Sequence, residues 1–469
     1  MANSLLSPPK TQFSHSAFRG RIGISRREIA PPTGIYARNF AYLKEGTVTT
    51  GTHSSLSATA VVLLSESEKV VLVAVDASWF KDPQDERELI RKPVLDALNL
   101  PESHLIISYS HTHSGPSVSP SESNRPGGEH IVPYMKQMSL QIIDAIREAD
   151  KRCSDAVLTW ATGKCDLAVV RDQVDPNSSQ RRIIVGFDPD VKADDTLVVG
   201  RITREEDGAI IGTIVNYACH PISFGWQNTM ASPDFVGPMR ECVESQTGNA
   251  PCLFLQGASG DLAPRRQYVA ELEIVEHNAR QIGFAVLSTL ESMLKPGHTL
   301  RYHGIVESGA PLGVWKQQKA PVSDVLRVQQ LQVPLPLKQR VNRDELIKQI
   351  EECKDSTLRE RLSRDLRISR FVGDGAIANT PAWIWRLGDG FIVAHPNEAY
   401  SQLQLALRSR FPDHTLAVLN LANGWCGYLP PKDLYDINAY AAWQTPFGPG
   451  ALEILTDLVS DSVSKMLGS

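Results

Sequence analysis

The chain has 469 residues, of which 42% are hydrophobic and 22% are charged. This composition is typical of a globular protein and excludes an intrinsically disordered or fibrous chain. The formal net charge is −5, with acidic and basic residues mixed along the sequence. This charge distribution argues against a nucleic-acid-binding protein, which normally carries a concentrated basic patch.

The first half of the sequence predicts alternating strands and helices. We expect a buried strand over 69–80, a helix over 85–100 and a second strand over 104–110, then a loop over 115–130 and a helix over 131–150. Strand, helix and strand in this order are typical of an α/β layer. In such layers, functional residues gather in the loops beyond the C-terminal ends of the strands.

The second half continues this mixture. The expected elements are strands 196–205 and 209–220 in a hairpin, strand and loop 252–261, helix 267–295, strand 300–308, irregular chain 317–342, a charged solvent-facing helical segment 343–370, strands 383–387, 391–396 and 414–424, helix 398–410 and a final helix from 448. We find no internal repeat and no low-complexity linker. The sequence therefore predicts one large α/β domain over 20–469, with a mixed sheet, surrounding helices and an active site at strand ends. A flexible N-terminal extension is expected over 1–19.

The cysteine pattern and the N-terminus indicate the cellular compartment. The seven cysteines are scattered and form no C-x-x-C pair, so we expect reduced thiols rather than a disulfide framework. No apolar run suits a signal peptide or a membrane span. We expect a cytoplasmic protein, with a transit peptide as the alternative, because residues 1–27 are basic and contain no acidic residue.

Four residues suggest a metal site. A catalytic zinc ion needs about three ligands from His, Glu, Asp or Cys and an open position for water. His111 and His220 each directly follow a predicted strand, Glu398 opens a predicted helix, and Tyr428 lies in a small-residue loop. Each also has a structural explanation: a hydrogen-bonded histidine, a glutamate that favours the helix dipole, or a packed aromatic ring.

Five short motifs occur in a defined order along the chain, and four of them contain these residues. They are HTHSGP, NYACHP, QGASGDLAP, NEAY and NGWCGY, and they follow an opening IGISRREIAPPTG. In this order the sequence resembles the neutral, non-lysosomal ceramidase family over residues 20–468. The resemblance implies that His111, His220, Glu398 and Tyr428 bind one zinc ion. It also implies hydrolysis of an amide, or an ester, in an N-acylated, ceramide-like substrate by a zinc-activated water.

The resemblance also implies roles for other residues. His113 would lie in the second shell of the zinc or contact the substrate. Tyr440, twelve positions after Tyr428, corresponds to a second active-site tyrosine, and Arg171 lies near the family's active-site arginine. Tyr440, Arg171 or protonated His113 would then stabilise the oxyanion, and His113 would act as general acid.

The sequence departs from the family in two places. The loop with Gly260 and Asp261, expected to contact the substrate, continues into Ala263 where the family has a serine, so we expect water rather than a serine to attack. The chain also ends after the predicted final helix, whereas larger ceramidases continue into a β-sandwich domain.

Two other functions remain open from the sequence. One is a catalytically inactive relative that binds lipids or acyl groups, which Ala263 suggests. The other is a metallo-phosphoesterase that uses Asp76 and the same histidines, although two metals would need several clustered aspartates and only Asp76 and Asp234 lie at candidate loop positions. In each case the expected partner is a small molecule or lipid, and the oligomeric state is not predicted.

Overall fold

An eight-stranded mixed sheet forms the centre of the molecule. The computed structural model describes residues 9–37, 47–179, 182–339, 341–373, 375–437 and 439–468, apart from the side chains of residues 356 and 357. The sheet has the order β16-β14-β13-β9-β2-β6-β7-β8. Its strands are β2 (Ala17–Glu28), β6 (Ser57–Leu64), β7 (Lys69–Val75), β8 (Leu105–Tyr109), β9 (Ser154–Lys164), β13 (Thr196–Arg204), β14 (Ile210–Tyr217) and β16 (Cys252–Gln256).

A second, four-stranded sheet packs against the first. Its order is β20 (Leu326–Pro336), β21 (Ile377–Leu387), β22 (Gly390–Ala394) and β24 (Thr415–Leu419). Apolar side chains of both sheets, including Phe18, Val61, Trp383 and Ile392, belong to one buried cluster. The prediction of irregular chain over 317–342 is therefore wrong. Its prolines misled the prediction, but β20 lies at the edge of its sheet, where proline is tolerated.

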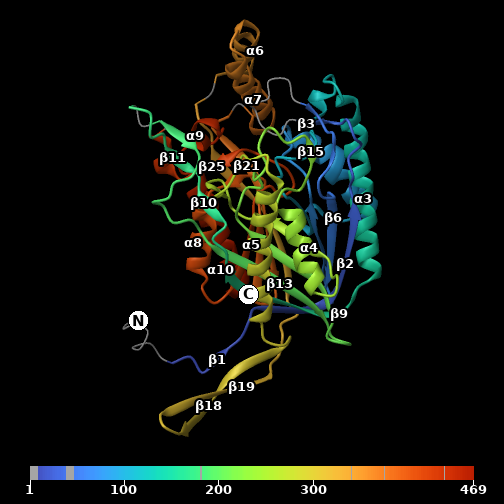
Figure 1. Cartoon of the computed structure of the whole chain (residues 1–469), viewed down its shortest axis with the longest axis vertical. Helices are drawn as coiled ribbons and strands as arrows, with labels where there is room; N and C mark the ends of the chain where they lie inside the picture. Colours follow the sequence, from blue (N-terminus) through green and yellow to red (C-terminus); the bar gives the residue numbers. More distant parts are fainter. Residues whose placement is uncertain are drawn as a thin grey trace.

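Helices cover the outer faces of the two sheets, so the fold is a four-layer α/β/β/α sandwich (Figure 1). The covering helices are α3 (Ile131–Lys151), α4 (Val236–Gln246) and α5 (Leu272–Glu291) on the large sheet, and α8 (Gln402–Arg410) and α10 (Ala451–Gly468) on the small one. The predicted single α/β domain with a mixed sheet is confirmed. In the described part of the chain, no helix is long and apolar enough to cross a membrane.

The remaining elements are short or project from the body. Figure 1 shows a three-stranded sheet at one end, made of β1 (Gln12–Phe13), β18 (His298–Glu307) and β19 (Pro311–Lys319), and helices α6 (Arg343–Glu352) and α7 (Ser356–Val372) at the other. Of the predicted N-terminal extension, residues 1–8 lie outside the described residues. The short elements are β3 (Tyr36–Ala37), β4 (Thr47–Val48), β5 (Gly51–Thr52), α1 (Pro83–Glu86), a π-helix (Arg87–Arg91), α2 (Lys92–Leu98), 3₁₀ turns at Glu102–His104, Pro120–Glu122, Gly128–His130 and Lys432–Tyr435, β10 (Ala168–Val170), β11 (Asp172–Val174), β12 (Ile183–Val185), β15 (Met230–Ala231), β17 (Leu262–Pro264), β23 (Glu398–Ala399), β25 (Tyr428–Leu429) and α9 (Tyr440–Gln444).

Three parallel strand pairs place the important loops at one edge. The pairs are β7–β8, β14–β16 and β22–β24, each joined through a helical crossover. At this edge Asn423 connects the two sheets, since its amide donates to the carbonyl of Leu105 over 2.9 Å and accepts from the amide of Ile107 over 2.8 Å. Loops that follow parallel strands therefore converge where the two sheets meet, as expected for a site in an α/β protein.

Candidate active site

His111, just beyond β8, has a backbone conformation that residues other than glycine rarely adopt. Its φ is +64°, in the left-handed region, which costs roughly 1–2 kcal/mol for a residue with a side chain. Hydrogen bonds hold it there, from the amide of Ser110 to the carbonyl of Val75 and from the amide of His113 to the carbonyl of Pro221. Both His111 ring nitrogens are buried, and neither makes a well-formed hydrogen bond within the described residues. Strain combined with unsatisfied buried nitrogens is typical of a functional histidine.

His220 is fully buried, and its tautomer is determined by one contact. Its Nδ1 lies 3.0 Å from the carbonyl oxygen of Leu262. Because a carbonyl only accepts, Nδ1 carries the proton and Nε2 keeps a lone pair. That Nε2 lies 3.1 Å from Oε2 of Glu398. A backbone carbonyl that accepts from the other ring nitrogen and so orients the imidazole is typical of metal-binding histidines.

Glu398 and Tyr428 lie opposite each other in neighbouring two-residue strands. β23 and β25 pair in parallel, with Glu398 in register with Tyr428. The indole nitrogen of Trp425 donates to Oε1 of Glu398 over 2.5 Å. The prediction that Glu398 opens a helix is wrong, because the helix begins only at Gln402. The short β23–β25 pairing, which depends on tertiary contacts, holds the carboxylate instead.

The geometry around Glu398 fits a bound cation. Its Oε2 lies 3.3 Å from Nε2 of His111 as well as 3.1 Å from Nε2 of His220. Burial, together with Arg171, lowers the pKa of His220 to about 4. At neutral pH the imidazole of His220 would then be uncharged. The lone pair on its Nε2 would face the carboxylate of Glu398 at hydrogen-bond distance, with no proton between them. A positive ion removes this repulsion, and two imidazole nitrogens with a carboxylate oxygen are donors that zinc accepts.

His113 belongs to the same cluster. In the described part of the chain, the potential ligand atoms of His111, His113 and His220 all lie within 4.8 Å of one another, so this group could hold a metal ion. Burial and the other two imidazoles hold the pKa of His113 well below its usual value. His113 is therefore neutral near pH 7, which disfavours the protonated form that the sequence hypothesis used.

Arg171 and Tyr440 both contact Tyr428. The buried guanidinium of Arg171 donates to the carbonyl of Gly260 over 3.1 and 2.8 Å and to the hydroxyl of Tyr428 over 3.1 Å. The ring of Tyr440 meets that of Tyr428 edge to face, with centroids 5.8 Å apart. The structure thus brings together Arg171, Tyr440, His113 and all four predicted ligands.

A cavity of about 680 Å³ opens onto these residues, apart from the fully buried His220. Its lining combines site residues with aromatic and aliphatic side chains and two further arginines. It consists of Trp79, His111, His113, Arg171, Arg182, Val185, Ile222, Trp226, Tyr268, Arg364, Glu398, Trp425, Tyr428, Tyr440 and Gln444. The sequence did not single out Trp425, Arg182 or Arg364. Arg364 belongs to α7, so the charged helical segment borders the cavity mouth.

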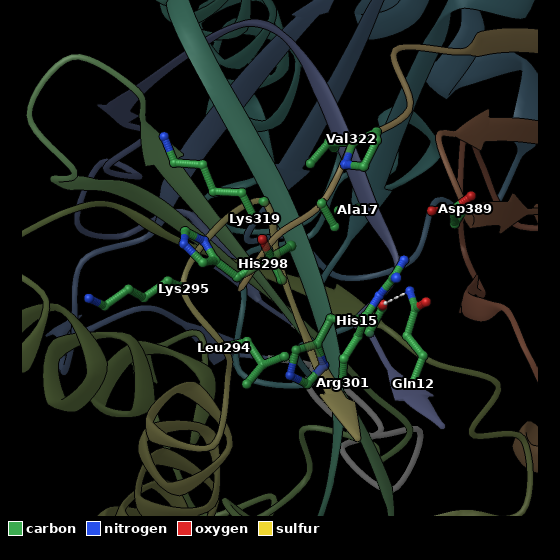
Figure 2. A pocket seen from close by; sticks show the side chains of 15 residues that line it. Gln12, His15, Ala17, Leu294, Lys295, His298, Arg301, Lys319, Val322 and Asp389 are labelled. Atoms are coloured by element: carbon green, nitrogen blue, oxygen red, sulfur yellow. Dashed lines mark hydrogen bonds between the residues drawn. The ribbon is translucent and has the colours of Figure 1, made fainter. Parts of the chain in front are cut away.

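A second cavity, of about 240 Å³, lies where β1 and β18 join the body (Figure 2). Its lining includes His15, Lys295, Arg301, Lys319 and Asp389, and none of the predicted site residues. The predicted chemistry therefore concerns the larger cavity alone.

Comparisons with known proteins identify the fold. No family model and no curated protein matches the sequence. The solved structures that match include a ceramidase complexed with C2, with a TM-score of 0.68 and 14% identity, and the neutral ceramidase from Pseudomonas aeruginosa, with a TM-score of 0.67 and 15% identity. Each match covers 95% of this chain and 74% of the other. This chain has the neutral ceramidase fold. The resemblance noted in the sequence is thus confirmed at the level of structure.

Within the neutral ceramidase fold, the loop after β16 lies behind the cavity. The carbonyl of Gly260 accepts from Arg171, and the carboxylate of Asp261 accepts from the amide and hydroxyl of Ser401 over 2.7 and 2.6 Å. A side chain at 260 would come within 3 Å of Tyr400 and the Glu398 carbonyl, which explains the glycine. Neither Gly260 nor Asp261 lines the cavity, and contact of either with a substrate stays a prediction.

The two aspartates considered for a phosphoesterase accept hydrogen bonds within the fold. Asp76 accepts two hydrogen bonds from the guanidinium of Arg240, over 3.0 and 2.7 Å. Asp234 accepts from the amides of Phe224 and Phe235 over 2.9 and 2.7 Å. Neither aspartate lines the cavity, so the described residues do not support a second metal there.

Proposed function

We propose that this chain is a zinc-dependent hydrolase that cleaves the amide bond of N-acylated lipids, with His111, His220, Glu398 and Tyr428 as the metal ligands. The observation that carries the proposal is the approach of two imidazole Nε2 atoms to one oxygen of Glu398, at 3.1 and 3.3 Å. The ceramidase complexed with C2 and the bacterial neutral ceramidase, which share the fold, support the substrate class.

A zinc ion held by these residues would activate a water molecule and polarise the scissile carbonyl. The residues of the chain supply the rest of the reaction. Neutral His113 takes a proton from the attacking water and delivers it to the leaving nitrogen as the C–N bond breaks. Arg171 and Tyr440 donate to the oxygen that becomes negative in the tetrahedral intermediate. One water is consumed, and a carboxylic acid and an amine leave.

The cavity suits an acyl chain. Trp79, Ile222, Trp226 and Tyr268 add apolar side chains to its polar lining, as is typical of pockets for amphiphilic ligands. An N-acylsphingosine is one such amide. The nucleophile in this proposal is water, so no serine is needed. Ala263 is buried in β17, opposite Val169 of β10.

A substrate panel tests this proposal. Zinc-loaded protein is given N-acylsphingosine, short N-acyl amino acids, matched carboxylic esters and phosphate esters, with and without a chelator. We expect amide hydrolysis that the chelator abolishes and added zinc restores. Tight binding of the amides without any turnover would instead favour the inactive lipid-binding relative. Turnover of phosphate esters alone would favour the phosphoesterase.

A further inference from the structure

Two arginines at the cavity mouth indicate the charge of the substrate. Arg182 directly precedes β12 and is exposed, and Arg364 is a partly buried residue of α7. Both line the cavity together with His111 and Glu398. They come from segments far apart in the sequence, so the fold places two guanidinium groups around one opening.

The cavity lining has a pronounced excess of positive charge. Among the described residues that line it there are three arginines and one acidic residue, Glu398. That carboxylate is already engaged by His111, His220 and Trp425. A zinc ion at this site would increase the positive charge further.

Arg182 and Arg364 differ from Arg171 in how their guanidinium groups are used. Arg171 is buried and directs its donors to Gly260 and Tyr428. In the described ranges, neither Arg182 nor Arg364 forms an ion pair with a carboxylate of the chain. Their donors are therefore available to a ligand.

Resting on the proposed amide hydrolysis, we propose that the substrate carries an acidic group on its amine part, which Arg182 and Arg364 bind. Guanidinium groups bind carboxylates, phosphates and sulfonates through paired N–H donors. The acyl chain contacts the apolar side chains of the lining, so the acidic group extends toward the mouth. N-acyl amino acids have this arrangement of an acyl chain, an amide and a carboxylate.

The neutral amine part of a ceramide uses these arginines less well. It offers hydroxyl groups and no charge, so both guanidinium groups would gain little beyond what water provides. An acidic amide replaces that water with charge-assisted hydrogen bonds, which are roughly twice as strong as neutral ones. The arginines also attract an anionic substrate toward the opening.

A matched pair of substrates tests the inference. N-dodecanoylglycine and N-dodecanoylglycinamide share the acyl chain and the scissile bond and differ in charge. We expect zinc-loaded wild type to favour the acid by about tenfold or more in kcat/KM. The double variant R182Q/R364Q loses this preference, because its kcat/KM falls much further for the acid than for the neutral amide. R359Q, which removes one exposed arginine elsewhere on α7, is the surface-charge control and keeps the preference.

The outcomes separate this inference from the proposed function. If both amides are cleaved without a preference for the acid, or if R182Q/R364Q retains it, the inference is overturned and amide hydrolysis stands. If neither of these amides is cleaved but N-acylsphingosine is, the inference is overturned and amide hydrolysis stands. If no amide is cleaved, N-acylsphingosine included, the proposed function fails, and calorimetric titration of the same two ligands then decides. Tighter binding of the acid, lost in R182Q/R364Q and kept in R359Q, would support an acidic ligand, and equal binding would refute it.

Discussion

Glu398 and Tyr428 stand side by side in a parallel strand pair only two residues long. This pairing brings a carboxylate after β22 next to a phenol after β24. The amide of Glu398 donates to the carbonyl of Gly427, and the amide of Tyr400 donates to that of Leu429, over 2.9 and 3.1 Å. The carboxylate of Glu398 and the phenol of Tyr428 are therefore positioned by backbone hydrogen bonds rather than by side-chain packing alone.

Trp425→Phe tests the contact that orients Glu398. The change removes the indole N–H that donates to Oε1 of Glu398 but keeps an aromatic ring. Loss of such a second-shell partner weakens metal binding by about 10–100-fold, and competition with a chelator measures it. Trp385→Phe is the control, since it removes an indole hydrogen bond to the carbonyl of Ser103 in the core. Equal zinc affinity in all three proteins would disprove the role of Trp425.

Arg240→Met tests whether Asp76 is structural. The pair is buried and joined by two hydrogen bonds, so the change leaves an uncompensated carboxylate. We expect the free energy of unfolding in urea to fall by about 3–5 kcal/mol, with zinc content unchanged. Arg204→Met breaks an exposed pair with Asp207 and should leave stability unaltered. Lost zinc in folded Arg240→Met protein would place Asp76 at the metal instead.

His395 makes the fold sensitive to acid. Burial lowers its pKa from 6.5 to about 3, so between these values the unfolded chain binds a proton that the folded protein does not. The stabilising effect is complete above pH 6.5 and is lost as pH falls. His395→Asn keeps an acceptor for the amide of Asn397 and removes this titration. As pH falls from 6.5 toward 3, the free energy of unfolding of the wild type should therefore decrease more steeply than that of His395→Asn. The difference in slope is about 1.4 kcal/mol per pH unit. Parallel curves for the two proteins would show that His395 does not titrate in this way.

Ala263→Ser restores the hydroxyl at the position of the family serine. Ala263 is fully buried in β17 and does not line the cavity. We expect no gain in amide hydrolysis and no covalent labelling by a serine-directed fluorophosphonate. A buried hydroxyl without a partner should cost roughly 1–3 kcal/mol of stability, measured by urea unfolding. Labelling at residue 263, checked by mass spectrometry, would show that a nucleophile can operate there.

The sequence predicted the site where local pattern determines structure. β8 and β14 are buried apolar runs whose ends are visible in the sequence, so His111 and His220 could be placed at strand ends. Glu398 was placed in a helix because its environment depends on pairing with Tyr428, a tertiary contact without local periodicity. The prolines of β20 concealed an edge strand.

The cavity mouth could not be predicted for the same reason. Arg182 lies beside a three-residue strand and Arg364 on a charged helix. Each resembles an ordinary solvated arginine in sequence. Only the packing of α7 and the β11–β12 hairpin around one opening brings them together.

Zinc content measured by elemental analysis tests the central claim most directly. Purified wild type, His111→Ala and His220→Ala are compared after dialysis against zinc and removal of the excess, with circular dichroism to show that each is folded. We predict one zinc ion per chain in the wild type and none retained in either folded variant. Full zinc content in both variants, or its absence from the wild type, would contradict the account.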